Sequence, residues 1–339
     1  MDLDARLTVL GSLNMDISVT VPALPGPGAT VLGGPAAFAP GGKGANQAVA
    51  AARLGAEAGV RVRMVGCVGD DDFGRALRRA LTAEGIDDQA VRTVPGAPTG
   101  IAMITVDEAG ENMITVAPGA NHEAGVPEIA AISESAAAGP PGAANVLIIS
   151  AEVPVPAILA ALTAAGGTGP AGPRWLTVLN LAPAPPRAAA AEILRARPDW
   201  LVVNESEAAA VLGRPVSGLG EAASAAAGLV AAGARNAVVT AGAAGAAYHG
   251  AKGNGQSQEP RGTVAAFPVR AVDTVGAGDT FVGALAVALA ARVPPRDAVT
   301  AAAAAGATAA ARPGTQAGMP RPADIRAVTG YQWPLAVVR

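Results

Sequence analysis

Short apolar runs alternate with stretches of helical periodicity along most of the chain. Apolar runs bounded by glycine or polar residues are typical of buried strands, and six of them occur at residues 7–11, 62–68, 146–150, 175–180, 200–204 and 236–240. Helical patterns lie between several of these runs, near residues 155–165, 186–196 and 204–212. Strands that alternate with helices predict a parallel sheet with right-handed crossovers.

Four further extended segments do not fit that alternation. Residues 17–22 and 29–38 are punctuated by glycine and proline, and residues 100–106 and 112–116 alternate in polarity around a turn at 107–111, which predicts a hairpin. These two separated parts of the chain are expected to form one small sheet outside the main one.

The last third of the chain is helical, and its first helix follows a glycine turn. Residues 269–272 are expected to end a strand, and Gly276 and Gly278 then turn the chain. From Ala277 onward, Phe281, Leu285 and Leu289 recur every four residues, which predicts a helix with one buried stripe. The first backbone N–H groups of such a helix are unpaired and favour an anion. Asp279 lies in this first turn, where it either caps the helix or serves a bound ligand.

A second glycine turn comes far upstream, in PGGKGANQA at residues 40–48. Glycines at 41, 42 and 44 let the backbone approach a ligand closely. Lys43 and Asn46 add side-chain donors at the same place. The spacing is not that of a P-loop, and a plain turn before an amphipathic helix is the alternative.

Composition narrows the function classes. The formal net charge of −3, without a basic run, makes nucleic acid and acidic membranes poor partners. The single cysteine, Cys67, is expected to be a buried structural thiol. No targeting segment is visible, and residues 284–311 are too interrupted to span a bilayer. We therefore expect a soluble, cytoplasmic protein. The acidic residues 70–72 favour a helix start over a metal site.

The two glycine turns together resemble a known family. Asp273, Gly276, Gly278, Asp279 and Thr280 resemble the C-terminal signature of the ribokinase family of sugar kinases, the PfkB group, and GGKGANQA is similar to its N-terminal signature. Residues 204–207 resemble the family's N-x-x-E motif, and the resemblance runs from about residue 7 to 328. It implies a three-layer α/β/α fold with a mostly parallel central sheet plus a small β-sheet lid. The chain would be a single domain, 1–339, with the lid at about 15–42 and 99–116 forming a homodimer interface.

The activity implied by this resemblance is ATP-dependent phosphorylation of D-ribose at O5. Asp279 would be the general base, and the backbone amides of Gly276, Ala277 and Gly278 would form the anion hole. The resemblance puts the sugar at Asn14, Asp16, Gly42, Lys43, Asn46, Glu152 and Asp279. It puts ATP at Asn204, Thr240, Gly242, Gly245 and Gly278. Asn14 and Glu152 also follow predicted strands, at the edge where ligands bind in open α/β sheets.

Two metal ions are implied as cofactors by the same resemblance. Glu207 would hold Mg²⁺ through water. Potassium would lie beside the anion hole, at Asp273, Val275, Ala309, Gly314 and Gly318. The family commonly has a serine at the last of these positions, so weaker potassium activation is expected here.

Other functions stay open at this point. Another PfkB acceptor, namely deoxyribose, fructose or a nucleoside, is the first alternative, although 3% aromatic residues argue against a stacked nucleobase. A sugar- or nucleotide-binding protein without catalysis is a second. A nicotinamide-dependent dehydrogenase is the weakest, because GSLNMD after the first strand lacks the G-x-G-x-x-G fingerprint.

Overall fold

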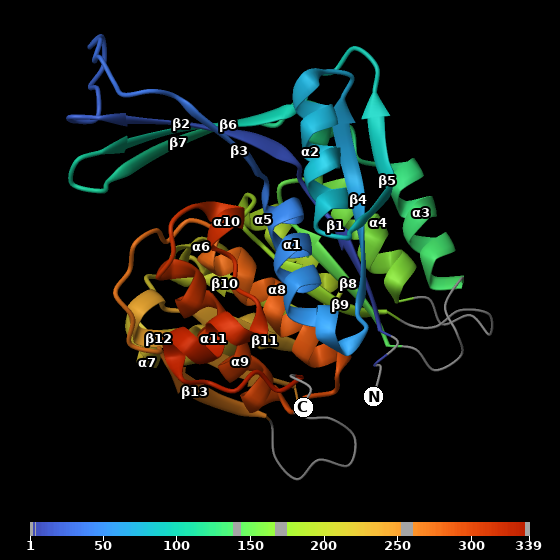
Figure 1. Cartoon of the computed structure of the whole chain (residues 1–339). Helices are drawn as coiled ribbons and strands as arrows, with labels where there is room; N and C mark the ends of the chain where they lie inside the picture. The colour runs from blue at the N-terminus through green and yellow to red at the C-terminus, as the bar shows by residue number, and fades with distance from the viewer. Residues whose placement is uncertain (1–2, 4, 138–143, 167–174, 252–259, 336–339) are drawn as a thin grey trace.

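The computed structural model of the chain describes residues 3, 5–137, 144–166, 175–251 and 260–335. Two sheets organise it (Figure 1). The larger has nine strands in the order β13-β12-β11-β10-β9-β8-β1-β4-β5, and the smaller has four in the order β3-β2-β6-β7.

The large sheet is mostly parallel, as expected. Only β12 and β13 run antiparallel to their neighbours; β4, β8, β9, β10 and β11 all pair in parallel. Since every crossover must return along a face of the sheet, both faces are covered by helices. The strands are β1 (Arg6–Leu10), β4 (Arg61–Gly69), β5 (Asp87–Val94), β8 (Asn145–Ser150), β9 (Leu176–Asn180), β10 (Trp200–Asn204), β11 (Asn236–Thr240), β12 (Gly245–Gly250) and β13 (Arg261–Ala265).

Two hydrophobic clusters, one on each face of the sheet, give the protein its three layers. Neighbouring strand residues alternate between them: Ile148 belongs to the first cluster and Ile149 to the second. The first cluster packs under α1 (Lys43–Gly55), α2 (Asp72–Ala83), α8 (Ala277–Ala290), α9 (Pro295–Ala310) and α11 (Pro322–Thr329). The second packs under α3 (Val126–Ala137), α4 (Val155–Ala165), α5 (Arg187–Arg195), α6 (Glu205–Leu212) and α7 (Gly218–Ala231).

The small sheet joins the two separated segments, as predicted. Its strands are β2 (Asn14–Val21), β3 (Ala37–Gly41), β6 (Gly100–Asp107) and β7 (Asn112–Ala117), and β2 pairs in parallel with β6. It projects from one side of the larger layers (Figure 1). The prediction of an extended strand over residues 29–38 was largely wrong, because β3 begins only at Ala37. Prolines in the exposed stretch before it cannot donate to a ladder.

The C-terminal third departs from the prediction in two respects. No strand forms at residues 269–272; the chain there leaves β13 and runs to the glycine turn. Helix α8 does not bury one stripe but nearly its whole circumference. It lies between α1 and α9, and a Cβ at Gly283 would come within 2.8 Å of Ala50 Cβ. Alanine and glycine on the facing helices therefore allow a close approach that a period count does not reveal.

Other predictions were partly met. The loop at 250–262 does join a hairpin, since β12 and β13 pair in antiparallel fashion, although residues 252–259 lie outside the described part of the chain. Nearly all of the expected loop at 166–173 also lies outside the described part of the chain. Cys67 is buried, and that burial raises the pKa of its thiol to about 12. Within the described residues, no helix is long and apolar enough to cross a membrane.

Candidate active site

Helix α8 begins with an open N-terminus. Its N-cap, Gly276, has φ 80° and offers no side-chain cap, and a Cβ there would approach Thr315 Cγ2 to 2.7 Å. The Ala277 N–H donates to Thr274 O at 3.3 Å, whereas the N–H groups of Gly276 and Gly278 find no acceptor among the residues that the structure describes. Free amides and the positive end of the helix dipole converge here, so the turn suits an anionic oxygen.

Asp279 is a buried carboxylate held on both oxygens. It is 6% exposed. Asn46 Nδ2 donates to its Oδ2 at 2.9 Å and Gln47 Nε2 donates to its Oδ1 at 3.0 Å. Gln47 also donates to Asn180 Oδ1 at 3.0 Å. Neutral amides fix the orientation of the carboxylate without cancelling its charge.

The N-terminus of α1 is closed by protein groups. Its N-cap, Gly42, has φ 88°. The Lys43 N–H donates to Glu152 Oε2 at 3.2 Å and the Gly44 N–H to Ser12 Oγ at 3.4 Å, while Ser12 Oγ itself donates to Glu152 at 2.5 Å. The GGKG turn is therefore a joint between α1, β8 and the first strand rather than an open phosphate loop.

Four charged side chains share one site beside this joint. The pKa of Asp16 is raised to about 7, first because the carboxyl is buried and then because Glu152 and Asp279 repel its charge; Lys43 opposes the shift. The pKa of Lys43 is raised chiefly by the charge of Asp279. A Cβ at Gly41 would overlap the Asp16 carboxyl, so the glycine leaves the space that this carboxyl occupies. The structure thus brings together the acidic and basic residues expected around a sugar.

Asn14, also expected in the sugar set, is buried and held by a residue that the sequence did not indicate. Asn121 Nδ2 donates to Asn14 Oδ1 at 2.8 Å. The same amide accepts from Leu13 N at 2.9 Å and donates to Leu13 O at 3.1 Å. Asn121 lies in a short 3₁₀ turn that no motif marks. Gln47, in contrast, could have been found, because it directly follows Asn46 in the same signature.

Two cavities meet at the start of α8. The larger, of about 490 Å³, is lined mainly by alanine, glycine and other apolar residues, including Gly242 and Gly245. The smaller, of about 320 Å³, is lined by Lys43, Asn204, Glu207 and Asp279 among others. Both are lined by Thr240, Thr274 and Gly278. Of the residues expected at ATP, Gly242 and Gly245 line the larger cavity, Asn204 lines the smaller one, and Thr240 and Gly278 line both. The open helix N-terminus therefore lies between the larger cavity and Asp279.

Asn204 and Glu207 form a capping box at the start of α6. Asn204 Oδ1 accepts from the Glu207 N–H, and Glu207 Oε2 accepts from the Asn204 N–H, both at 2.8 Å. The N-x-x-E motif therefore caps helix α6, and this cap leaves Glu207 Oε1 uncommitted. Burial raises the pKa of Glu207, while Lys43 lowers it and Asp279 raises it. The described residues contain no cluster of three or more acidic, histidine or cysteine side chains that could hold a metal ion. The uncommitted Glu207 Oε1 is an oxygen donor of the kind that Mg²⁺ accepts, beside water and substrate oxygens.

The residues expected at potassium lie behind the open turn. Asp273 accepts from Val275 N at 3.0 Å and from Gly314 N at 3.1 Å. A Cβ at Gly318 would lie 3.2 Å, 3.4 Å and 3.5 Å from the carbonyl oxygens of Arg312, Pro313 and Ala309. A carboxylate and a group of carbonyls form a hard-oxygen donor set that fits a monovalent cation. The first two of these carbonyls were not predicted.

Comparisons with known proteins agree over almost the whole chain. The model of the pfkB family of carbohydrate kinases matches residues 4–322. A curated ribokinase from Schizosaccharomyces pombe is 37% identical, covering 93% of this chain and 95% of its own, and a deoxyribokinase from Salmonella typhi is 32% identical over 83% and 84%. A ribokinase from Arabidopsis thaliana, solved with ribose and ATP, superimposes with a TM-score of 0.77 at 26% identity, over 97% of this chain and 99% of that one.

Proposed function

The chain belongs to the pfkB family of carbohydrate kinases, and from that premise we propose that it transfers the γ-phosphoryl group of ATP to O5 of D-ribose. The products are ADP and ribose 5-phosphate. The full-length similarity to curated ribokinases and to a ribokinase solved with ribose and ATP supports this substrate pair. The observation that carries the proposal is the buried Asp279 carboxylate in the first turn of α8, beside the open N-terminus of that helix and in the smaller of two adjoining cavities.

In the proposed reaction, Asp279 accepts the O5 proton as O5 attacks the γ-phosphorus. The bond from that phosphorus to the bridging oxygen breaks and ADP leaves with the electron pair. Phosphoryl transfer depends on in-line positioning and charge stabilisation more than on covalent catalysis. The amides of Gly276, Ala277 and Gly278 would stabilise the transferring oxygens, and the Ala277 amide would give up its long turn bond to Thr274.

Sugar recognition would use side chains of both charge types. Asp16 and Glu152 accept hydroxyl hydrogens, and Lys43 donates to hydroxyl oxygens. Asn14 and Asn46 would donate through their amide nitrogens, since Asn121 and Gln316 engage their oxygens. Gly42 would bring the turn close to the sugar by packing against the backbone of residues 12–14. On the nucleotide side, Asn204, Thr240, Gly242, Gly245 and Gly278 would contact ATP.

The two metal ions would have separate roles. Mg²⁺, held through water by Glu207, would neutralise phosphate charge when bound. Potassium would bind the carboxylate of Asp273 with carbonyls at Val275, Ala309 and Gly314 and the backbone at Gly318, and its charge would reinforce the anion hole. Gly318 has no side-chain hydroxyl to offer as a further ligand, so activation is proposed to be modest.

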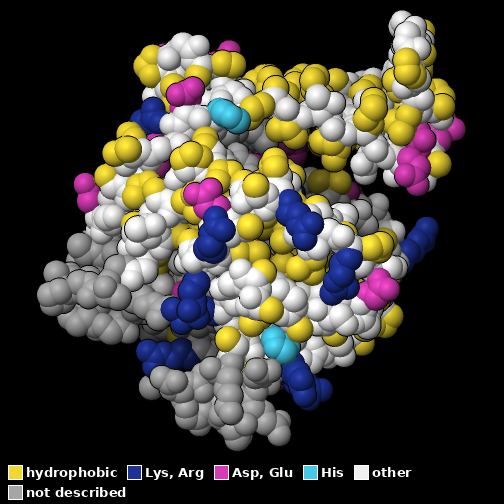
Figure 2. All heavy atoms as spheres, turned by 180° about the vertical axis from the view of Figure 1, so that it is seen from behind, with side chains coloured by type: hydrophobic (Ala, Val, Ile, Leu, Met, Phe, Trp, Pro, Cys, Tyr) yellow, Lys and Arg dark blue, Asp and Glu magenta, His cyan; other side chains and the backbone are white. Residues whose placement is uncertain are grey.

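We also infer a lid and a dimer. Residues 15–42 and 99–116 would form a lid over the sugar, within a single domain spanning 1–339. Ile114 lines the smaller cavity with Lys43 and Asp279, as a lid residue would. Other exposed apolar side chains lie on this small sheet and its connecting segment, at Leu32, Phe38, Met103, Met113 and Val116. Figure 2 shows hydrophobic side chains along the projecting arm. Burying them against a second copy would form a homodimer. Because the reaction consumes ATP, we infer a cytoplasmic location.

The proposal is tested by ATP consumption with purified protein over a panel of sugars and nucleosides, with the product identified by ³¹P and ¹³C NMR. Ribose should give the highest kcat/KM, with phosphate on O5. A higher kcat/KM for fructose or adenosine would contradict the acceptor but keep the kinase class. No ATP consumption with any acceptor would favour a binding protein without catalysis.

Deoxyribose is the second candidate acceptor, favoured by the similarity to a deoxyribokinase. The two sugars differ only at the 2-hydroxyl, so the preference of the enzyme between them depends on whether the site hydrogen-bonds that group. A site built to pair with the 2-hydroxyl loses a buried partner with deoxyribose. Equal kcat/KM for both sugars would show that the 2-hydroxyl is not recognised.

A further inference from the structure

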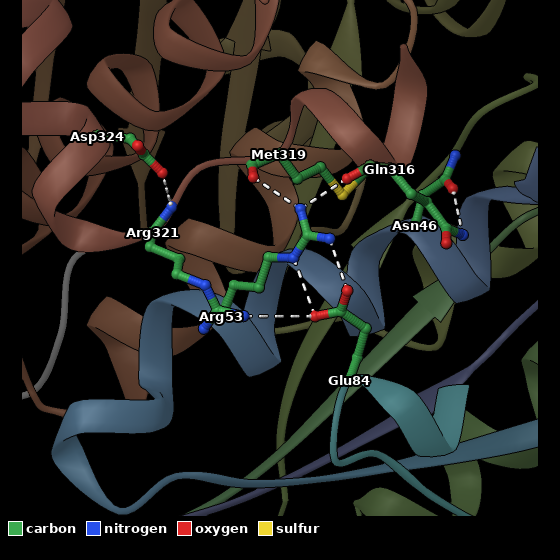
Figure 3. Close-up of polar contacts among 7 residues, drawn as sticks. All are labelled: Asn46, Arg53, Glu84, Gln316, Met319, Arg321 and Asp324. Carbon is green, nitrogen blue, oxygen red and sulfur yellow. Dashed lines mark hydrogen bonds and ion pairs between the residues drawn. The ribbon is translucent and has the colours of Figure 1, made fainter. Parts of the chain in front are cut away.

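Arg53, in the last turn of α1, is held by four hydrogen bonds outside the residues assigned to ligands. Its guanidinium donates to both carboxylate oxygens of Glu84, at 3.0 Å and 2.6 Å. It also donates to the carbonyl oxygens of Gln316 and Met319, at 2.6 Å and 2.8 Å. Figure 3 shows the side chain between these partners. The hydrogen bond from Arg53 lowers the pKa of Glu84, so the pair stays charged at neutral pH.

The segment to which Arg53 donates these two backbone hydrogen bonds lies against the open turn at the start of α8. Both carbonyls belong to α10 (Thr315–Gly318) and its C-cap. The residue before α10, Gly314, donates to Asp273 at 3.1 Å, and Thr315 lies where a Cβ on Gly276 would be. Asp273, just before the glycine turn, thus fixes the α10 segment at its start, and Arg53 fixes it at its end.

The Gln316 side chain connects this segment to the Asp279 carboxylate through Asn46. Its Nε2 donates to Asn46 Oδ1 at 3.0 Å, and Asn46 Nδ2 donates to Asp279 Oδ2 at 2.9 Å. An amide has one acceptor end and one donor end. Because Gln316 occupies the oxygen of Asn46, the amide nitrogen must face Asp279. Without that bond, the Asn46 amide is held from the Asp279 side alone, so it can rotate and hold the carboxylate less firmly.

We infer that Arg53 is a positioning residue for phosphoryl transfer: it fixes the α10 segment so that Gln316 orients the Asn46 amide and thereby the Asp279 base. The inference rests on the proposed role of Asp279. It requires that Arg53 and Gln316 affect kcat through the same chain of contacts, from Arg53 through Gln316 and Asn46 to Asp279. A purely structural role for Arg53 requires only that its loss lowers stability.

Arg78 provides a matched control. It donates to a carboxylate, Asp88 Oδ2, at 2.7 Å and to two carbonyls, Val91 O at 3.1 Å and Asp88 O at 3.4 Å. Those partners lie in β5, on the edge of the large sheet. Within the described part of the chain, neither Asp88 nor Val91 hydrogen-bonds to an expected ligand residue. Arg78→Met therefore removes a similar set of bonds without reaching the site.

The test is a double-mutant cycle of Arg53→Met and Gln316→Met, with kcat, the KM for ATP and the melting temperature measured for each protein. Each single variant should lose about 10- to 100-fold in kcat with little change in the KM for ATP, as for other small misplacements of a reacting group. The double variant should lose no more than the worse single variant, because one path is broken twice. Arg78→Met should keep its kcat even where its melting temperature falls equally.

Multiplicative losses in the double variant, or a kcat loss in Arg78→Met as large as in Arg53→Met, would overturn the inference. So would wild-type kcat in Arg53→Met. If Arg53→Met does not fold, Arg53→Lys takes its place, since lysine keeps the charge and can reach only some of the four acceptors; an intermediate kcat is expected and a wild-type kcat would contradict the inference. A wild-type protein that phosphorylates no acceptor would instead overturn the proposed function.

Discussion

Helices α1 and α8 begin with the same kind of glycine N-cap but differ in whether protein groups occupy their first backbone N–H groups. Each has a glycine N-cap with positive φ and no side-chain cap, Gly42 in α1 and Gly276 in α8. In α1, the first N–H groups are taken by Glu152 and by Ser12. In α8, two glycine N–H groups have no acceptor among the described residues. A glycine-rich helix start is thus not by itself a phosphate site; what decides is whether protein groups already occupy its amides.

This difference divides the proposed labour. The amides at the α1 start are occupied by protein groups, so this start would serve the sugar through the side chains of Lys43 and Asn46. The α8 start is open and would offer backbone amides to the phosphoryl group. Substitutions at the two glycines should therefore fail in different ways.

The sharpest contrast is expected from alanine at each glycine. Gly276→Ala should lower kcat by about 10²–10³-fold, the usual cost of losing one anion-hole donor, because the new Cβ would displace Thr315 and shift the turn. Gly42→Ala should mainly unfold the protein, because its Cβ would lie 2.7 Å from Asn14 N and 2.8 Å from Ser12 O, backbone atoms that cannot easily move. Steady-state kinetics and melting curves on both variants would separate these outcomes.

If Gly276→Ala kept full turnover in a folded protein, the α8 amides would not be the anion hole. A Gly42→Ala protein with an unchanged melting temperature would show that the α1 start is less rigid than the contacts indicate.

A smaller effect is expected at Asp16, on the α1 side. Asp16→Asn should raise the ribose KM by about 10- to 100-fold with little change in the KM for ATP, since an unpaired buried polar group costs about 1–3 kcal/mol. Because the pKa of Asp16 is raised to about 7, the wild-type ribose KM should also rise as the pH falls below 7. Asp16→Asn should lose this pH dependence.

The same pKa makes a prediction about stability. The folded pKa of Asp16 lies above the usual 3.8, so the folded state binds more protons than the unfolded state between these values. The ligand-free protein then loses stability as pH rises through this range. Asp16→Asn removes that loss and should raise the melting temperature more at pH 8 than at pH 4. Equal increases in melting temperature at both pH values would mean that folding does not raise the pKa of Asp16.

The smallest effect is expected behind the α8 turn. Gly318→Ser would add a hydroxyl next to the carbonyl oxygens of Ala309, Arg312 and Pro313, and thus one more ligand for potassium. The ratio of rates in potassium and lithium should rise by a factor of a few, on the order of one hydrogen-bond-sized interaction. Gly318→Ala is the control for the added Cβ. The cation site would be contradicted if no monovalent cation changed the rate of either variant or of the wild type.

The sequence predicted the parts of this site that lie within one motif. Asp279 at the start of α8, and Lys43 and Asn46 at the start of α1, follow from local glycine turns and helical periodicity. The parallel sheet follows from apolar runs that are long enough to be buried on both faces.

What the sequence could not reveal depends on contacts between distant segments. Asn121 holds Asn14 across 107 residues and Gln316 holds Asn46 across 270, and neither stands in a pattern. The full burial of α8 depends on small residues of α1 and α9, so the period along α8 alone underestimates it. The missing strand at 269–272 has a similar cause: an apolar run became the wall of a cavity, where Val269 and Ala271 line the larger pocket.

The measurement that tests the account most directly is the turnover of Asp279→Asn. Asparagine keeps the shape of the side chain and remains a good residue for a helix start, but it cannot take a proton. If Asp279 is the base beside the open α8 N-terminus, kcat should fall by about 10²–10⁴-fold while the melting temperature and the dissociation constants for ribose and ATP stay close to those of the wild type. A well-folded Asp279→Asn protein with near-wild-type kcat would contradict the central claim.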